Sequence, residues 1–258
     1  MKELNGRELA GYIKERQAHE VKALRSRKIF PKLSIFYDND SPVIAKYMSL
    51  KQAYGNDIGI RVEITKITTE NAEEKIRVAA EDTDVTGIIV QLPLLECNMS
   101  ILDLIPLKKD VDGLRGESDT ATAMAIHWLL TGYGVDLLGK KLGIIGHGKL
   151  VGAPLEKMWR ESGYDVTVYD KGDDMSTLPE CDVVVTATGV PRLVKPKMIK
   201  HGAAVVDAGT ASEDGVIVGD VDDSVRKRDD LTITPKIGGV GPLTVAMLFE
   251  QVLRAAQK

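Results

Sequence analysis

A glycine-rich segment in the second half of the chain has the residue types and spacing needed to bind a nucleotide. Gly146, Gly148 and Gly152 follow an apolar segment that begins at Lys140 and lead into a helix-like segment, 150–162. A tight glycine turn between a strand and a helix lets the backbone approach a pyrophosphate, and the helix N-terminus adds free N–H groups. Because glycines also make ordinary strand–helix turns, the spacing alone does not decide between these two interpretations.

The flanking elements favour the nucleotide-binding interpretation. A second apolar segment, 164–169, ends on Asp170, where a βαβ dinucleotide-binding unit carries an acidic residue for the ribose hydroxyls. This position favours a ribose contact for Asp170 over a surface turn. His147, inside the loop, is either a neighbour of the cofactor phosphates or an exposed residue without a role. The whole pattern therefore predicts a dinucleotide site, although the loop is one residue longer than the commonest fingerprint.

Three polar residues in the first half are candidates for catalysis. Tyr47 and Lys51 are four residues apart in a helix-like segment, so they share one face. On spacing alone, a half-buried Tyr and a solvated Lys remain the simpler interpretation. Gln91 ends an otherwise apolar strand-like segment, and the carboxyl ends of parallel strands face the ligand crevice. A buried amide needs partners, so Gln91 is either a satisfied core residue or part of a site.

Asp110 and Asp112 form a pair of carboxylates in a short loop, Lys108–Gly113. Such a pair is compatible with metal binding or with acid–base chemistry, but no His stands nearby and no third ligand is evident. A turn-forming role is the alternative, since Asp bonds its own backbone in turns. The sequence alone leaves both interpretations open.

The elements that must position these residues alternate between strands and helices, which predicts parallel α/β layers. We expect two α/β domains: a catalytic domain of residues 1–118 plus 238–258, and a Rossmann-like dinucleotide-binding domain of residues 119–237. Apolar periodicity predicts helices over 5–28, 43–56, 72–81, 122–130, 150–162 and 243–256. Strands are expected over 32–37, 61–67, 87–92, 164–169, 182–188, 203–208 and 231–234, beside the apolar segment at Lys140.

Composition narrows the function classes. The chain has 258 residues, 43% hydrophobic and 28% charged, with a net charge of −4 and no long basic run, so nucleic acid is not an expected partner. The apolar runs are too short to cross a membrane, and the polar first twenty residues do not resemble a signal peptide. Cys97 and Cys181 lack metal-ligand spacing and are expected to be reduced thiols in a cytoplasmic protein.

Together, these segments resemble the bifunctional methylenetetrahydrofolate dehydrogenase/cyclohydrolase family, in order and over essentially the whole chain. The matching pieces are Tyr47-x-x-x-Lys51 with Gly59-Ile60, Val90-Gln-Leu-Pro93, Lys109-Asp-Val-Asp-Gly113, Gly146 to Pro154, and Gly238-Gly-Val-Gly-Pro-Leu-Thr244. The resemblance implies oxidation of 5,10-methylenetetrahydrofolate by a nicotinamide cofactor. It further implies hydrolysis of the methenyl product to 10-formyltetrahydrofolate in the same cleft, within one-carbon metabolism and purine biosynthesis. It also implies a homodimer.

The same resemblance assigns roles to individual residues. Lys51 is the expected proton carrier, with Tyr47 packing on the substrate, Gln91 orienting the amine and Asp112 holding the pterin, and no metal is needed. Further folate contacts are expected at Leu92, Pro93, Gly239, Gly241 and Pro242. The cofactor is expected to bind at Gly146, His147, Gly148, Leu150, Val151, Asp170, Lys171, Thr188, Gly189, Gly209 and Thr210.

The sequence departs from the family pattern at points that bear on the cofactor. The family's Arg-Ser after the first loop glycine is His147-Gly148 here, which removes a cationic partner for a 2′-phosphate. Asp170 would repel that phosphate, whereas Lys149 and Lys171 supply cations nearby. NADP is the expected cofactor, with NAD as the alternative.

Two other function classes fit the same plan. One is a shikimate- or amino-acid-type dehydrogenase, which would also use a Lys and an Asp beside a bound cofactor. The other is a non-enzymatic dinucleotide-sensing protein, which would not require Tyr47, Lys51, Gln91 and Asp112 to converge. Formation of methenyl-folate would distinguish the folate enzyme from the first alternative. The second alternative would be favoured if those four residues lay on separate surfaces.

Overall fold

The fold was analysed in a computed structural model, which describes residues 2–116, 119–213 and 216–257. The chain divides into two compact units. The first unit comprises residues 11–121 and 245–258, and the second comprises residues 1–10 and 122–244. Residues 1–10 and 238–244 thus belong to the second unit, whereas the domain bounds expected from the sequence placed them in the catalytic domain. The mixed α/β fold class is confirmed.

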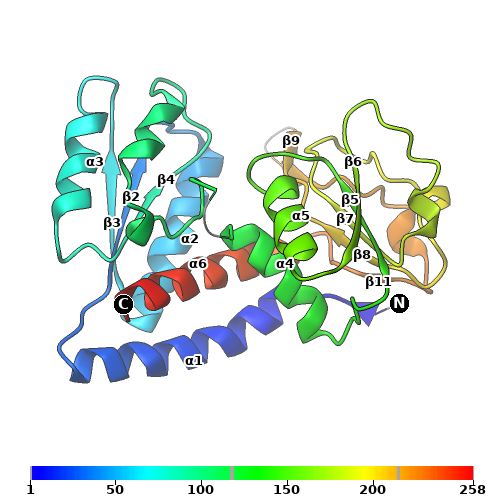
Figure 1. Ribbon diagram of the computed structural model, residues 1–258, viewed down its shortest axis with the longest axis horizontal. Coiled ribbons are helices and arrows are strands. Elements are labelled where there is room, and N and C mark those ends of the chain that lie inside the picture. The colour runs from blue at the N-terminus through cyan, green and yellow to red at the C-terminus, as the bar shows by residue number, and fades with distance from the viewer. Residues whose placement is uncertain (1, 117–118, 214–215, 258) are drawn as a thin grey trace. The chain divides into compact units, whose positions relative to one another are not determined.

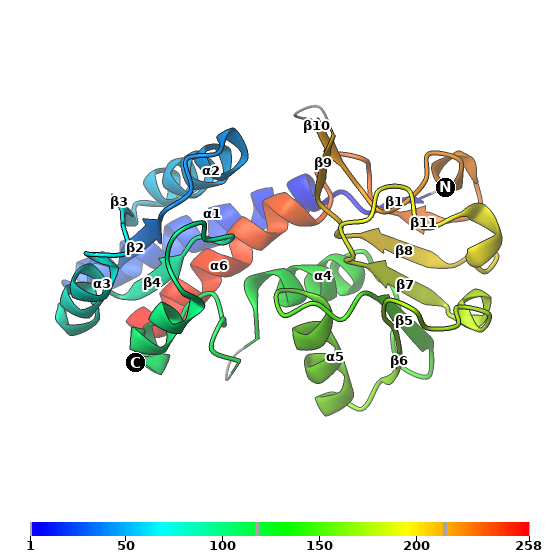
Figure 2. The same ribbon diagram turned by 90° about the horizontal axis from the view of Figure 1, so that it is seen from above.

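The first unit is built on a three-stranded parallel sheet in the order β3-β2-β4. Its strands are β3 (Arg61–Lys66), β2 (Lys32–Tyr37) and β4 (Gly87–Val90). Helices α2 (Pro42–Ile58) and α3 (Ala72–Glu81) lie on opposite sides of this sheet (Figures 1 and 2). All four residues of β4 are buried, which explains why its sequence is continuously apolar rather than alternating.

Helix α2 has clear start and stop residues, and it carries Tyr47 and Lys51. The Ser41 hydroxyl accepts the Ile44 N–H at 3.3 Å, and Pro42 takes the first helical position, where no N–H is needed. At the other end Gly59 adopts a left-handed conformation, with φ of +85°, which only glycine adopts without strain. The caps therefore fix where the helix begins, and with it the face on which Lys51 lies.

Two long helices, α1 (Gly6–Ser26) and α6 (Val240–Ala256), contribute residues to both units. Within the first unit they lie side by side (Figures 1 and 2), and the Gln17 side chain donates to the Ala246 carbonyl at 3.0 Å. Gln17 also accepts a hydrogen bond from the Tyr54 hydroxyl on α2 at 2.9 Å. This buried network therefore ties α1, α2 and α6 together.

The second unit contains a six-stranded parallel sheet in the order β1-β11-β8-β7-β5-β6. Its strands are β1 (Lys2–Glu3), β11 (Thr232–Ile233), β8 (Ala204–Asp207), β7 (Val183–Thr186), β5 (Lys141–Ile145) and β6 (Asp165–Tyr169). The chain passes from β5 outward to β6 and then returns to β7 on the other side of β5. This reversal of strand order is where open α/β sheets bind ligands, beyond the carboxyl ends of the strands.

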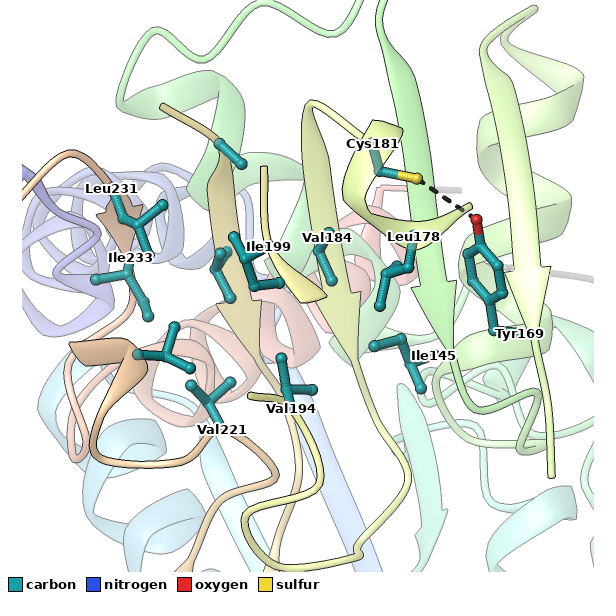
Figure 3. Close-up of a cluster of buried hydrophobic side chains, with 13 residues drawn as sticks. Ile145, Tyr169, Leu178, Cys181, Val184, Val194, Ile199, Val221, Leu231 and Ile233 are labelled. Atoms are coloured by element: carbon teal, nitrogen blue, oxygen red, sulfur yellow. Dashed lines mark hydrogen bonds between the residues drawn. The ribbon is translucent and has the colours of Figure 1, made fainter. Parts of the chain in front are cut away.

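Different elements cover the two faces of the larger sheet. Helices α4 (Ala121–Gly132) and α5 (Gly152–Glu161) lie on one side in Figure 2. A cluster of buried apolar side chains lies where short 3-10 helices meet the strands (Figure 3), with Leu178 and Val225 from those helices and Val184 and Val205 from the strands. There the Tyr169 hydroxyl lies 3.8 Å from the Cys181 sulfur, so Cys181 is a buried core thiol.

Most expected elements lie where the sequence places them, and the differences are local. Helix α5 begins at Gly152 instead of residue 150, because residues 149–151 form a turn. Helix α6 begins at Val240, three residues before its expected start. Strand β1 and the antiparallel pair β9 (Ala211–Glu213) and β10 (Val216–Val218) were not expected.

Two features of the described residues bear on the class of protein. None of the helices there has both the length and the apolar composition needed to cross a membrane. In the same part of the chain, no three His, Cys, Asp or Glu side chains group in a way that could hold a metal ion.

Candidate active site and nucleotide-binding loop

Lys51 is the centre of the candidate site in the first unit. It lies on α2, one turn after Tyr47, and only 9% of it is exposed. Its ammonium donates a hydrogen bond to the Gln91 side-chain oxygen at 2.8 Å. A Lys is rarely buried unless it has a polar partner. Lys51 is therefore not the solvated residue that its spacing from Tyr47 alone suggested.

Gln91 is held from both ends. It follows β4 directly, and its backbone N–H donates to the Phe36 carbonyl of β2 at 2.8 Å. Its side-chain amide donates to the Leu92 carbonyl at 3.1 Å, which leaves the amide oxygen for Lys51. Gln91 is half-buried, and both the nitrogen and the oxygen of its side chain have a partner, one of which is Lys51.

The two carboxylates of the short loop have different surroundings. Asp110 is buried and accepts the backbone N–H groups of Leu114 at 3.3 Å and Arg115 at 3.0 Å, which is the turn-forming role. Asp112 is half-buried, and its charge acts on Lys51. Burial raises the pKa of Asp112, Lys51 opposes the shift, and Asp110 adds to it.

The surroundings of Lys51 suit proton transfer. Burial lowers the pKa of its amine, because a charged ammonium loses hydration there, while the negative charge of Asp112 opposes the shift. Tyr47 is half-buried, and burial raises the pKa of its phenol, so the hydroxyl stays neutral. The arrangement offers an amine that can exchange a proton, an amide that orients it, and a carboxylate that can bind N–H donors.

The loop after β4 carries Leu92 and Pro93, joined by a cis peptide bond. Asp38 and Asn39, which sequence analysis did not single out, hold this loop. The Asp38 carboxylate accepts the backbone N–H groups of Leu95, Glu96 and Cys97 at 2.8–3.1 Å. Asn39 donates to the Pro93 carbonyl at 3.2 Å. No sequence motif marks these partners, because the bonds join positions more than fifty residues apart.

The glycine-rich loop of the second unit is shaped for close approach. Gly146 follows β5 with φ of +92°. A Cβ on Gly152 would lie 1.9 Å from the Gly146 carbonyl oxygen, and a Cβ on Gly146 would lie 2.9 Å from the Ala187 oxygen. A Cβ on Gly148 would meet no atom within 4 Å. The loop is therefore folded onto its own backbone with open space at Gly148, and these residues fit a dinucleotide phosphate.

The residues expected around the adenosine end are exposed. Asp170 ends β6, and its carboxylate accepts the His147 N–H at a long 3.4 Å. The His147 side chain has a partner, since its Nε2 lies 2.6 Å from a carboxylate oxygen of Glu156 on α5. Leu150, Lys149 and Lys171 are exposed, and Val151 caps the start of α5.

The remaining cofactor candidates follow β7 and β8, beside the loop. Thr188 donates its backbone N–H to the fully buried Asp220 at 2.7 Å, and Gly189 follows with φ of +68°. Gly209 donates its N–H to Asp207 at 3.2 Å, and a Cβ there would lie 2.0 Å from Asp220. Thr210 is exposed. Asp207 and Asp220 therefore hold both loops, and sequence analysis missed them.

Gly239, Gly241 and Pro242 lie at the start of α6, in the second unit. The Gly238 carbonyl accepts the Arg7 N–H at 3.0 Å, and a Cβ on Gly6 would lie 1.8 Å from the Gly239 oxygen. The structure thus brings Lys51, Gln91 and Asp112 together in one unit, with Tyr47 a turn away. It gathers Gly146, Asp170, Thr188 and Gly209 at the carboxyl edge of the other sheet. Their roles toward ligands stay predictions.

Comparisons with known families match both units. Residues 4–112 match the family described as tetrahydrofolate dehydrogenase/cyclohydrolase, catalytic domain. Residues 120–258 match the NAD(P)-binding domain of the same family. The bifunctional protein FolD of Hydrogenobaculum sp. (strain Y04AAS1) is 36% identical over 98% of this chain and 97% of its own length.

Solved structures give the same result. The bifunctional FolD methylenetetrahydrofolate dehydrogenase/cyclohydrolase of Campylobacter jejuni has a TM-score of 0.92 at 35% identity, and covers 100% of this chain and 99% of its own. The Trypanosoma brucei FolD, complexed with NADP and an inhibitor, has a TM-score of 0.90 at 31% identity, and the match covers 98% of this chain and 96% of its own. A shikimate 5-dehydrogenase from Thermus thermophilus is similar in fold alone, with a TM-score of 0.57 at 14% identity over 88% of this chain and 98% of its own.

Proposed function

Because this chain belongs to the tetrahydrofolate dehydrogenase/cyclohydrolase family, we propose that it oxidises 5,10-methylenetetrahydrofolate with NADP and hydrolyses the methenyl product to 10-formyltetrahydrofolate. The observation that supports this most is the buried Lys51, hydrogen-bonded to Gln91 and within the electrostatic reach of Asp112. A scaffold or sensor has no need for such a buried amine.

Bound NADP supplies the acceptor for the hydride that leaves the methylene carbon. In the second step, water adds to the methenyl carbon, the bond from this carbon to N5 breaks, and the new C–O bond becomes the formyl C=O. Water gives up two protons: one is released to solvent, which balances the positive charge of the methenyl cation, and the other moves to N5. Lys51 carries this proton, since burial favours its neutral amine and Gln91 fixes its direction. Tyr47 packs on the flat substrate with a neutral hydroxyl.

Asp112 holds the pterin in this proposal. The pterin edge presents several N–H donors, and a carboxylate accepts such donors through charge-assisted hydrogen bonds. Its raised pKa in the free protein reflects burial, and donors from a substrate favour the ionised form. Leu92, Pro93, Gly239, Gly241 and Pro242 complete the proposed folate contacts.

We further propose NADP as the cofactor, held by the loop from Gly146 to Val151 and by Asp170, Lys171, Thr188, Gly189, Gly209 and Thr210. The close-packed glycines and the family's NAD(P)-binding domain support this, as does the NADP complex of the Trypanosoma brucei relative. A cytoplasmic homodimer that works in one-carbon metabolism and purine biosynthesis completes the proposal on the strength of the family resemblance.

One assay tests this function. Purified protein is mixed with 5,10-methylenetetrahydrofolate and NADP or NAD, and both reduced cofactor and methenyl-folate are followed by ultraviolet absorbance. The expected result is cofactor reduction with formation of methenyl-folate and then 10-formyltetrahydrofolate. Reduction of cofactor with shikimate, and none with the folate, would contradict the proposal.

A further inference from the structure

Three side chains beside the glycine-rich loop, His147, Glu156 and Arg160, form a cluster linked through the Glu156 carboxylate. The two oxygens of Glu156 are separately engaged: one lies 2.6 Å from His147 Nε2, and the other accepts from Arg160 Nε at 2.8 Å. Glu156 and Arg160 are one turn apart on α5, whereas His147 is the residue directly after Gly146. Glu156 therefore connects the helix to the loop that would hold the cofactor.

This cluster lies on the side of the loop where βαβ dinucleotide folds place the ribose. β6 pairs with β5 in parallel, with Tyr169 opposite Ile145, so that Asp170 and Gly146 end neighbouring strands. The His147 N–H points to the Asp170 carboxylate. In βαβ dinucleotide folds the acid at the end of the second strand contacts the ribose hydroxyls, and a 2′-phosphate replaces one of these hydroxyls in NADP.

Side chains of both signs lie near this position in the sequence: the acids Asp170 and Glu156, and the bases Arg160, Lys149 and Lys171. Asp170 and Glu156 are acidic and disfavour a 2′-phosphate, whereas His147 and Arg160 would favour it. Burial works against ionisation of Glu156, but the hydrogen bonds from Arg160 and His147 outweigh it and hold the pKa of this carboxyl below its usual range. Glu156 is thus a carboxylate whose two oxygens already engage His147 and Arg160.

We propose that Glu156 determines how strongly this protein prefers NADP over NAD, by competing with the 2′-phosphate for His147 and Arg160. The inference rests on the proposed use of a nicotinamide dinucleotide. Removing the charge of Glu156 frees both side chains for the phosphate and takes away one repelling group. NAD carries no 2′-phosphate, so its affinity should change little.

The test measures cofactor binding without the folate, so it does not depend on catalysis. Dissociation constants for NADP and NAD are measured by titration calorimetry on the wild type, Glu156→Gln and a control, Glu161→Gln. Glu161 is exposed and ends the same helix, so the control removes the same charge elsewhere on α5. Circular dichroism spectra and thermal unfolding verify that each variant is folded.

In Glu156→Gln the ratio of NAD to NADP dissociation constants should rise by about five- to tenfold, the scale of one charge removed at a partly exposed site. Glu161→Gln should leave the ratio within about twofold. An unchanged or lower ratio in Glu156→Gln, an equal rise in both variants, or no binding of either cofactor to the wild type would overturn the inference. Failure of the folate assay with normal cofactor binding would instead refute only the proposed reaction.

Discussion

The amine of Lys51 is the group on which the proposed hydrolysis depends. We predict that Lys51→Met lowers the cyclohydrolase rate by about 10²- to 10⁴-fold, the range that a positioned proton carrier supplies. Met has a similar length and fills the space of the buried Lys51 stem, so the fold should remain. The rate is measured by loss of methenyl-folate absorbance. Lys46→Met, at an exposed position of the same helix, is the control and should remain near wild type. A Lys51→Met enzyme that hydrolyses normally would refute the role.

Asp112 is proposed to hold the folate and to raise the pKa of Lys51, and one substitution tests both effects. We predict that Asp112→Asn raises the KM for the folate by about tenfold or more, since it removes charge-assisted hydrogen bonds. It should also move the acid limb of the kcat–pH profile for hydrolysis to lower pH. The sign follows because the Asp112 charge raises the pKa of Lys51, and losing it lets that pKa fall further.

Both effects are measured on purified protein, with Asp103→Asn as the control at an exposed site. An acid limb that stays in place or moves to higher pH would show that Asp112 does not act on the titrating group. An unchanged KM would mean that Asp112 does not hold the pterin.

At the scale of elements, the loop after β4 depends on a single carboxylate. We predict that Asp38→Asn destabilises the protein by about 1–3 kcal/mol, because an amide nitrogen then faces backbone N–H groups that need an acceptor. Burial alone would raise the pKa of Asp38, but three backbone N–H groups outweigh it and lower the pKa. The stabilisation is therefore present above the unfolded-state pKa and is lost as pH falls through the folded-state pKa.

Urea unfolding of the wild type and of Asp38→Asn, at pH 7 and in acid, measures the difference in their free energies of unfolding. The gap between wild type and Asp38→Asn should be largest at pH 7 and should shrink in acid. Asp40→Asn, at the exposed position two residues later, should cost much less. A gap that grows in acid would contradict the proposed role of the Asp38 carboxylate.

The glycine-rich loop offers a matched pair of substitutions. We predict that Gly152→Ala weakens NADP binding by about tenfold or more, because its Cβ would lie 1.9 Å from the Gly146 oxygen and force the loop apart. Gly148→Ala has open space around its Cβ and tests whether the space itself is used by the cofactor. Calorimetric titration with NADP measures both. Normal NADP binding by folded Gly152→Ala would show that the shape of the loop is not needed.

At the scale of the whole molecule, the sequence predicts those elements whose apolar pattern is local. Residues 72–81 have helical periodicity and form α3 with the same bounds, and 32–37 form β2 as expected. The two residues of β1 are too few to show any pattern, and they form a strand only because β11 lies beside them. The start of α5 was misplaced because a turn at 149–151 looks like the beginning of a helix.

The candidate site follows the same division. Sequence motifs mark Lys51, Gln91 and Asp112, and the fold places these residues together. Asp38, Glu156 and Asp220 were not, because each is defined by a partner distant in sequence or on another element. Nothing local distinguishes Asp38, which binds three N–H groups, from Asp40, which is exposed.

The pairing of β1 with β11 has a consequence for how the protein is made. Lys2–Glu3 form the edge strand of a sheet whose neighbouring strand, Thr232–Ile233, is translated only after the whole segment between them. The first unit likewise needs residues 245–258. Neither unit is an uninterrupted piece of chain, so each is completed only after residues of the other unit have been translated. A gene cut near residue 121 should thus yield two fragments that each lack a part of their unit, and a nascent chain stalled before residue 232 should remain a target for proteases.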